Sequence, residues 1–119
     1  MKKHFLLYFF MILIVFLSGC ETIHQNSSKG LYTWGSFETQ IYGHFNGLSP
    51  TTQIQTMERE RQHIESSNRS APPGFYAHLG LLYAEIGDDY HAIQYFIEEK
   101  TLFPEAATFM DLLLSRYGS

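Results

Sequence analysis

Aromatic and small residues recur at fixed spacings in the C-terminal half of the chain, and this pattern limits the possible folds more than any other feature. The positions are Tyr76, Leu79, Gly80, Tyr83, Ala92, Phe96 and Pro104. Gly80 and Ala92 would let two antiparallel helices approach closely, because neither carries a bulky side chain. Tyr83 and Phe96 would fill the space between these helices. The spacing therefore predicts a closely packed helical hairpin that ends at Pro104, since proline cannot continue a helix.

The rest of the chain from residue 31 onward shows helical periodicity without a convincing strand. We expect helices over about 36–45, 50–66, 73–86, 89–102 and 104–116. Ser49 can cap the second helix, and Pro50 is tolerated at its first position. Gly87 can end the third helix in the left-handed conformation, and Asp88 can cap the fourth. The sequence thus predicts an all-α fold of about five helices.

Side-chain patterns also predict which face of each helix is buried. The first helix is expected to bury Phe37, Ile41, Tyr42 and Phe45. The fourth helix is expected to present Ile93, Phe96, Ile97 and Lys100 to its neighbours. The second helix has a narrow apolar face and should be the most exposed, with a solvated side formed by Glu58, Arg59, Glu60 and Glu65. Trp34, the sole tryptophan, is expected in the core.

Residues 73–106 resemble a tetratricopeptide repeat, whose pattern is Trp-x2-Leu-Gly-x2-Tyr, then Ala-x3-Phe and a closing Pro over 34 residues. Tyr76 stands where Trp is usual, and Glu99 stands where a small residue is usual. One repeat cannot bury its own faces, so the flanking helices must cover it. The resemblance implies a concave groove that could hold a peptide or helix of a partner. The residues that would line it are Ala77, Leu81, Ala84 and Glu85. The alternative is that the chain's own first helices cover this groove. An ordinary helical hairpin in a small bundle would use nearly the same core residues.

The N-terminal residues follow the order of a bacterial secretion signal, with basic residues first, an uncharged run next and small residues before a cysteine. Lys2 and Lys3 precede an uncharged run over residues 5–17, which is shorter than the roughly 20 residues that a membrane-spanning helix needs. The run ends in a tetrapeptide that resembles a lipobox, Leu17-Ser18-Gly19-Cys20. That resemblance implies cleavage before Cys20 and lipidation of this cysteine. The alternative is an uncleaved N-terminal anchor with an unmodified thiol.

The lipobox divides the chain into three parts. Residues 1–19 are expected to form a lipoprotein signal peptide, residues 20–30 a lipidated cysteine with a flexible tether, and residues 31–119 the helical domain. Acyl chains on Cys20 would anchor the protein to a membrane. In Gram-negative lipoproteins, an Asp directly after the cysteine resembles a signal for retention in the inner membrane. This chain has Glu21 at that position. We therefore expect an outer-membrane protein that faces the periplasm.

Charge and the lack of catalytic motifs narrow the function classes. Twelve Asp and Glu stand against eight Lys and Arg, of which two precede Cys20, so the mature chain has a formal net charge of −6. Without a basic patch, nucleic acid is not an expected partner. The histidines of the mature chain are scattered at His24, His44, His63, His78 and His91. We expect no metal, no cofactor, no small-molecule substrate and no enzymatic activity, and a helix start accounts for Asp88-Asp89.

The chain resembles one family along its whole length, and three stretches carry the resemblance. They read LYTWGSF, PPGFYAHLGLLYAEIGD and EEKTLFPEAATFMDLLL, and the resemblance covers residues 1–117. The family consists of small bacterial lipoproteins classed as a domain of unknown function, whose genes tend to lie beside that of a curli-pore-type secretion lipoprotein. The resemblance implies a part in an envelope complex.

The sequence therefore predicts a non-enzymatic adaptor that binds another envelope lipoprotein or a secretion component. Two alternatives stay open. A hydrolytic or cell-wall-binding envelope protein would use an aromatic groove around Trp34 and Tyr32. A purely structural lipoprotein would need no such surface, so substitutions in the predicted groove would leave its role unchanged.

Overall fold

The computed structural model describes residues 1–5, 7–9 and 30–118, of which residues 2–5 and 7–9 are helical. The elements after residue 30 are α2 (Phe37–Phe45), α3 (Pro50–Ser66), α4 (Phe75–Glu85), α5 (Asp89–Leu102), the 3₁₀-helix η1 (Pro104–Ala106) and α6 (Ala107–Tyr117). Residues 30–118 contain no named strand, only an isolated parallel bridge between Tyr32 and Ser70. The predicted all-α fold is confirmed. Within the described ranges, no helix combines the length and hydropathy needed to cross a bilayer.

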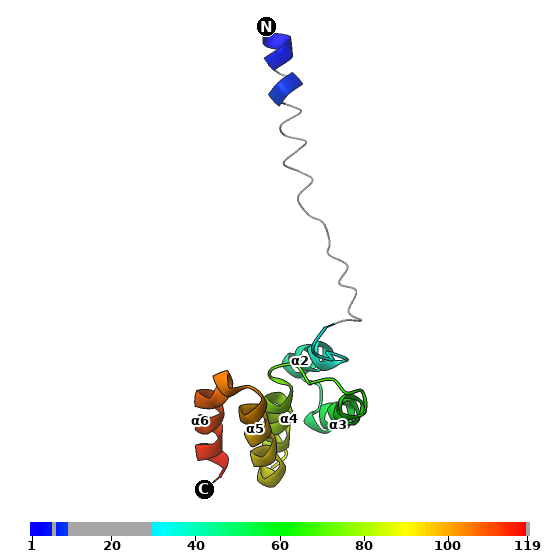
Figure 1. Cartoon of the computed structure of the whole chain (residues 1–119). Helices are drawn as coiled ribbons and strands as arrows, with labels where there is room; N and C mark the ends of the chain where they lie inside the picture. Colours follow the sequence, from blue (N-terminus) through cyan, green and yellow to red (C-terminus); the bar gives the residue numbers. More distant parts are fainter. Residues whose placement is uncertain (6, 10–29, 119) are drawn as a thin grey trace.

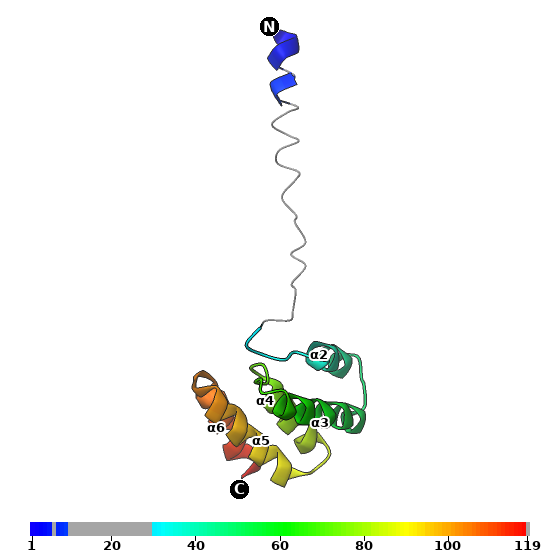
Figure 2. The ribbon, with the colours of Figure 1, turned by 45° about the vertical axis from the view of Figure 1, so that its right-hand side comes forward.

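Helices that follow one another in the chain also lie side by side in space. Contacts join α2 to α3, α3 to α4, α4 to α5 and α5 to α6, and the α4–α5 pair is the most extensive. Figure 1 shows α3, α4, α5 and α6 in a row, with α2 across the upper side of the row, and Figure 2 shows the same order after a turn of the molecule. The domain is thus an array in which each helix is covered by its neighbours in sequence.

Most predicted helix limits are confirmed, and the differences have local causes. The left-handed conformation of Gly74, with φ of 90°, delays the start of α4 to Phe75. Residues 104–106 form a 3₁₀ turn before α6 and are not part of the helix itself. Asp88 caps α5 as predicted, since its Oδ1 accepts a hydrogen bond of 3.1 Å from the His91 backbone N–H. The predicted cap by Ser49 is wrong, because this side chain makes no capping hydrogen bond.

The apolar core consists of two clusters. The larger one joins α2, α3 and α4 with the loop before α4, through Phe37, Ile54, Met57, Ile64, Ala71, Phe75, Tyr76, Leu79 and Leu82. The smaller one joins α5 and α6 through Ala92, Phe96, Met110 and Leu113. Tyr83 packs against both clusters. The core therefore continues along the helix array and is not gathered at one centre.

Several buried faces differ from the prediction. On α2, Tyr42 and Phe45 are 72% and 83% exposed, whereas Gln40 is buried. On α5, Ile97 is 46% exposed, and the buried stripe is Ala92, Phe96 and Glu99. Trp34 is 47% exposed, so its predicted place in the core is wrong. Apolar spacing thus identified the helices correctly and placed Phe37 and Phe96 in the core, but it assigned Tyr42, Phe45 and Ile97 to the wrong side of their helices.

Close contact between α4 and α5 depends on Gly80, as the sequence predicts. A Cβ atom added at Gly80 would lie 2.6 Å from Phe96 Cε1 and 3.1 Å from the backbone oxygen of Ala92. The first distance is far below van der Waals contact, and the Phe96 ring is fully buried and cannot move aside freely. Glycine is therefore the residue that allows these two helices to approach as they do.

The buried carboxylate of Glu99 takes the place of a missing helix cap. Gly74, at the start of α4, has no side chain to cap the helix. Glu99 is 2% exposed, and it accepts hydrogen bonds from the backbone N–H groups of Gly74 at 2.6 Å and Ala77 at 3.3 Å. Burial raises the pKa of Glu99, although these N–H groups oppose the shift. Glu99 thus satisfies N–H groups that the helix itself cannot pair.

We expect substitution of Glu99 to destabilise the domain strongly. Glu99→Leu would leave two N–H groups of α4 buried without a partner, at a cost of about 1–3 kcal/mol each. The melting temperature should fall by about 4–8 °C per kcal/mol for a domain of this size. Glu99→Gln keeps one acceptor oxygen and should lie between wild type and Glu99→Leu. Thermal unfolding followed by circular dichroism measures this, with Glu98→Leu as the exposed control; equal melting temperatures of the two Leu variants would contradict it.

Candidate interaction surfaces

The repeat-motif residues lie in α4, in α5 and at the start of η1, and most of them are buried. Tyr76 and Leu79 belong to the larger core cluster, and Ala92 and Phe96 to the smaller one. Tyr83 is only partly buried and bridges the two clusters, while Gly80 faces Phe96, and Pro104 begins η1. These residues build the hairpin, so they position a site and do not form one.

The predicted groove residues are partly covered by the chain's own C-terminal helices. Ala77, Leu81 and Ala84 of α4 pack against the smaller core cluster, whose members come from α5 and α6. Glu85 is exposed, and its Oε1 lies 3.6 Å from His44 Nε2 on α2. The structure therefore brings the three apolar residues together and leaves Glu85 apart from them. Whether this face binds a partner stays a prediction.

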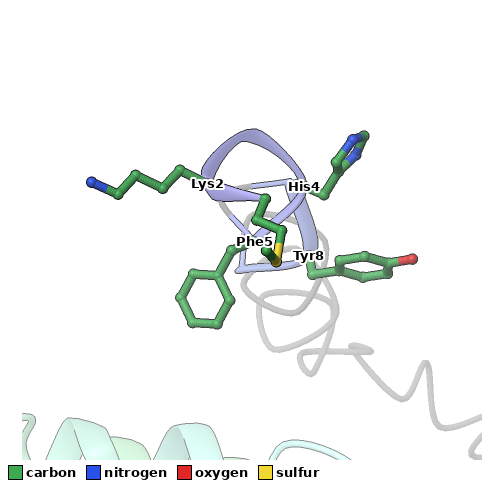
Figure 3. Close-up of a pocket in the computed structure, with 5 residues that line it drawn as sticks. Lys2, His4, Phe5 and Tyr8 are labelled. Atoms are coloured by element: carbon green, nitrogen blue, oxygen red, sulfur yellow. The ribbon is translucent and has the colours of Figure 1, made fainter.

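Residues Leu17, Ser18, Gly19 and Cys20 lie outside the described residues, so the lipobox stays a prediction. Among the described residues, no group of three or more His, Cys, Asp or Glu side chains could hold a metal ion. A hollow of about 660 Å³ lies on the N-terminal helical turns and is lined by Met1, Lys2, His4, Phe5 and Tyr8. In Figure 3, Lys2, His4, Phe5 and Tyr8 project in different directions from the backbone. Their side chains do not converge on a common point, so this hollow is not a candidate site.

Glu58 on α3 forms a polar contact that sequence analysis missed. The prediction placed Glu58 on the solvated side of its helix, which is wrong. Its carboxylate accepts hydrogen bonds from Tyr83 of α4 at 3.0 Å and from Tyr95 of α5, and Arg61 Nε lies 2.8 Å away. Burial acts to raise the pKa of Glu58, but hydrogen bonds from Tyr95, Arg61 and Tyr83 outweigh it and lower the pKa. This contact ties three helices together and is structural.

The loop before α2 is fixed to the rest of the domain at both ends. The Thr33 backbone N–H donates to the Ser70 carbonyl at 2.9 Å. Ser36 donates to the Glu60 carboxylate through its backbone N–H at 3.0 Å and through its hydroxyl at 2.5 Å. Gly35 between them has φ of 46°, and an added Cβ would lie 1.4 Å from Glu60 Oε1. Glycine is therefore required at this position.

A hollow of about 330 Å³ lies beside this loop. It is lined by Tyr32, Thr33, Trp34, Gly35 and Arg69. The Trp34 ring stacks on buried Phe37 with 6.5 Å between ring centroids. The structure thus places Tyr32 and Trp34 at one hollow together with Arg69, and the Glu60 carboxylate lies beside Gly35 of the same loop.

A second apolar surface lies on α6. Phe109 and Leu112 are 53% and 63% exposed, while Met110 and Leu113 on the opposite side of the same helix are buried. The spacing of three places Phe109 and Leu112 on one stripe. We call these two residues the α6 stripe. Sequence analysis did not single out Phe109 and Leu112.

Buried His78 connects α4 to α2 and α3. Its Nε2 lies 3.1 Å from Gln53 Oε1, and its ring packs edge-on against that of His44 with 5.2 Å between centroids. Gln53 Nε2 in turn donates to the Leu48 carbonyl at 2.8 Å. Burial, with a smaller contribution from nearby His44, lowers the pKa of His78 from 6.5 to about 4. His78 is therefore neutral in the folded protein at pH 7 and donates to Gln53.

Acidification should weaken the domain through His78. A histidine whose pKa is lowered by folding stabilises the folded state above its unfolded pKa of 6.5, and this contribution is lost as pH falls toward about 4. We expect the free energy of unfolding to decrease in this window, by an amount on the order of 3 kcal/mol for the full shift. His78→Gln, which cannot ionise but can still donate to Gln53, should flatten the decrease in urea unfolding. His63→Gln, at an exposed position of α3, is the control, and an unchanged slope in His78→Gln would refute this role.

Comparison with known proteins identifies the family. The family described as a domain of unknown function (DUF4810) matches residues 31–113. The chain belongs to this family. The DUF4810 match begins at the loop before α2 and reaches into α6, so it contains Trp34, the Glu58 contact, Glu99 and the α6 stripe. No curated protein and no solved structure matches the chain.

Proposed function

We propose that this DUF4810 protein is a lipid-anchored adaptor of the bacterial envelope. Acyl chains on Cys20 hold it at the outer membrane, facing the periplasm, and its tetratricopeptide-like domain binds another envelope protein in a secretion or surface-assembly complex. The protein acts by binding and not by catalysis. The observation that carries the proposal is the α6 stripe, an exposed apolar surface on the last helix of the array.

The N-terminal sequence supports the lipid anchor. A basic start, an uncharged run, a small pair and then Cys20 follow in the order that a lipoprotein signal needs. The chain between Cys20 and the domain is polar, and the DUF4810 match begins only at residue 31. Two or more acyl chains hold a protein on a membrane, whereas one chain binds only marginally. Anchoring of this kind explains why a separate short tether precedes the packed domain.

The packing of α4, α5 and α6 supports the repeat-like interpretation. Gly80 and Phe96 make the close contact within the hairpin, as the two helices of a repeat do. Met110 and Leu113 of α6 then pack in one cluster with α5, and Ala77, Leu81 and Ala84 of α4 pack against that cluster. The first helix of a following repeat contacts both preceding helices in this way. The label of a tetratricopeptide-like array thus rests on packing as well as on spacing.

The α6 stripe fits an amphipathic helix of the partner. In a repeat array, the next helix would cover this stripe, and within the described residues no other element does so. A helix that docks on such a surface carries apolar anchor residues at intervals of three and four positions. Phenylalanine and leucine side chains of this kind supply most of the buried area in helix-in-groove complexes. We therefore place the partner's helix on α6.

The lipid anchor predicts the behaviour of a Cys20→Ser variant. Serine cannot take a thioether-linked lipid, so the signal should stay uncleaved and the protein should lose its acyl chains. Growth with labelled palmitate, followed by electrophoresis, should show labelled mature protein for wild type and an unlabelled, larger precursor for Cys20→Ser. Ser27→Ala, a change in the tether outside the lipobox, serves as the control. Normal processing and membrane fractionation of Cys20→Ser would overturn the anchor.

The adaptor role predicts position-specific crosslinks in living cells. A photoreactive amino acid at position 109 or 112 should capture one envelope protein, which mass spectrometry identifies. The same amino acid at position 90, where Tyr90 is 70% exposed on α5, is the control and should capture none. Phe109→Ser with Leu112→Ser should lower the yield of copurified partner by about tenfold or more, because anchors at interface centres carry most of the binding energy. Equal capture from all three positions, or none from 109 and 112, would contradict the proposal.

A further inference from the structure

Residues 31–48 expose large apolar side chains that the proposed partner surface on α6 does not use. Leu31 is 83% exposed, Trp34 47%, Tyr42 72% and Phe45 83%. We call these four residues the N-terminal edge. Single exposed apolar residues are ordinary on protein surfaces. Their concentration in one short stretch of a small domain is the feature that needs an explanation.

Trp34 is presented from a fixed loop. Hydrogen bonds on both sides of it, from Thr33 to Ser70 and from Ser36 to Glu60, leave the loop little freedom. The stack on Phe37 supports one face of the indole ring, and the rest of the ring remains open to solvent. A loop fixed in this way holds a large apolar side chain out of the core, although burial would have been the more favourable place for it.

The N-terminal edge also lies where the chain enters the domain. In Figures 1 and 2, the cyan segment that precedes α2 and the helix α2 itself occupy the same side of the helix array, while the C-terminus lies on another side. Ten residues, 21–30, separate Cys20 from Leu31, and they reach at most about 33–36 Å when extended. A lipid anchor on Cys20 would therefore hold the domain within this distance of the bilayer by the side on which the chain enters it.

Charge is distributed to match such an orientation. Residues 30–57 contain a single Asp, Glu, Lys or Arg, which is Glu38, whereas residues 58–118 contain ten acidic and five basic side chains. A membrane surface with anionic lipids attracts an uncharged aromatic edge more readily than an acidic one. Tryptophan and tyrosine are the residues that favour the boundary between headgroups and acyl chains. Arg69 lines the same hollow as Trp34.

We propose that the N-terminal edge rests on the surface of the bilayer that carries the lipid anchor, with Trp34, Tyr42 and Phe45 at the level of the headgroups. This inference rests on the proposed lipid anchor and adds to it a fixed orientation of the domain. The partner is a lipid surface, recognised by apolar and aromatic side chains next to a cation. The Glu60 carboxylate, which Ser36 holds, lies beside the loop that carries Trp34, whereas most acidic side chains of the domain belong to residues 85–111.

Trp34 reports directly on this contact, because it is the sole tryptophan of the chain. Lipidated protein, purified as the host cell processes it, is reconstituted into vesicles of phosphatidylethanolamine and phosphatidylglycerol whose acyl chains carry bromine next to the headgroup. Bromine quenches indole fluorescence only at short range. We expect the emission to fall to about half of that in vesicles without bromine, and to shift to shorter wavelength than in detergent. Equal emission in both kinds of vesicle overturns the proposal.

Variants separate the membrane contact from the other proposals. Tyr42→Ser with Phe45→Ser should lower the quenching of Trp34 severalfold, and both side chains are exposed, so the fold should persist by circular dichroism. Phe109→Ser with Leu112→Ser, an equal change on α6, should leave quenching at the wild-type value. Protein that floats with the vesicles without being quenched overturns the membrane contact alone, whereas protein that fails to float overturns the anchor and this inference with it. Emission that changes only on addition of cell-wall sacculi would assign the edge to glycan and overturn the lipid contact.

Discussion

The hydrogen bonds between the Glu99 carboxylate and the start of α4 are the interaction on which the rest of the array depends. They fix the N-terminal end of α4 against the C-terminal part of α5, so the register between the two helices is set. With that register, Phe96 meets Gly80 and the smaller core cluster can form beneath α6. A buried carboxylate is costly when its partner is lost. The residue that departs from the repeat pattern is therefore the one that orients the hairpin.

Polar contacts connect parts of the structure that the apolar clusters leave separate. Glu58 of α3 accepts hydrogen bonds from tyrosines of α4 and α5, and the rings of Tyr76, Tyr95 and Tyr83 stack in sequence beside it. This arrangement reaches from the larger cluster toward the smaller one. A small domain without disulfides has little core to spare, and Cys20, the sole cysteine, lies before it. The hydrogen bonds to Glu58 and the stacked tyrosine rings therefore supply part of the stability that the small apolar core does not provide.

Sequence predicted the helices well because their signals are local, and it predicted the surfaces poorly because these depend on neighbours. The limits of α3 and α5, the turn at Gly87 and the cap at Asp88 follow from residues within one turn of each other. The exposure of Trp34 and Phe45 depends on how α2 lies across the other helices, which periodicity does not encode. Sequence analysis placed Glu58 on a solvated face and noted Glu99 only as a departure from the repeat pattern, and the structure shows which N–H and O–H groups reach them. The lipobox lies outside the described residues and stays a prediction from sequence.

The two proposed surfaces together restrict the kind of partner. In both views, α2 lies across the row of helices, and α6 lies at one end of that row. If the N-terminal edge rests on the bilayer, the row of helices runs along the membrane, and α6 with its stripe lies at one end of that row. A partner that is itself held at the same membrane meets this stripe by diffusion in two dimensions, at a high effective concentration. Weak docking of one helix on two exposed side chains then suffices, which favours another lipid-anchored protein over a freely diffusing one.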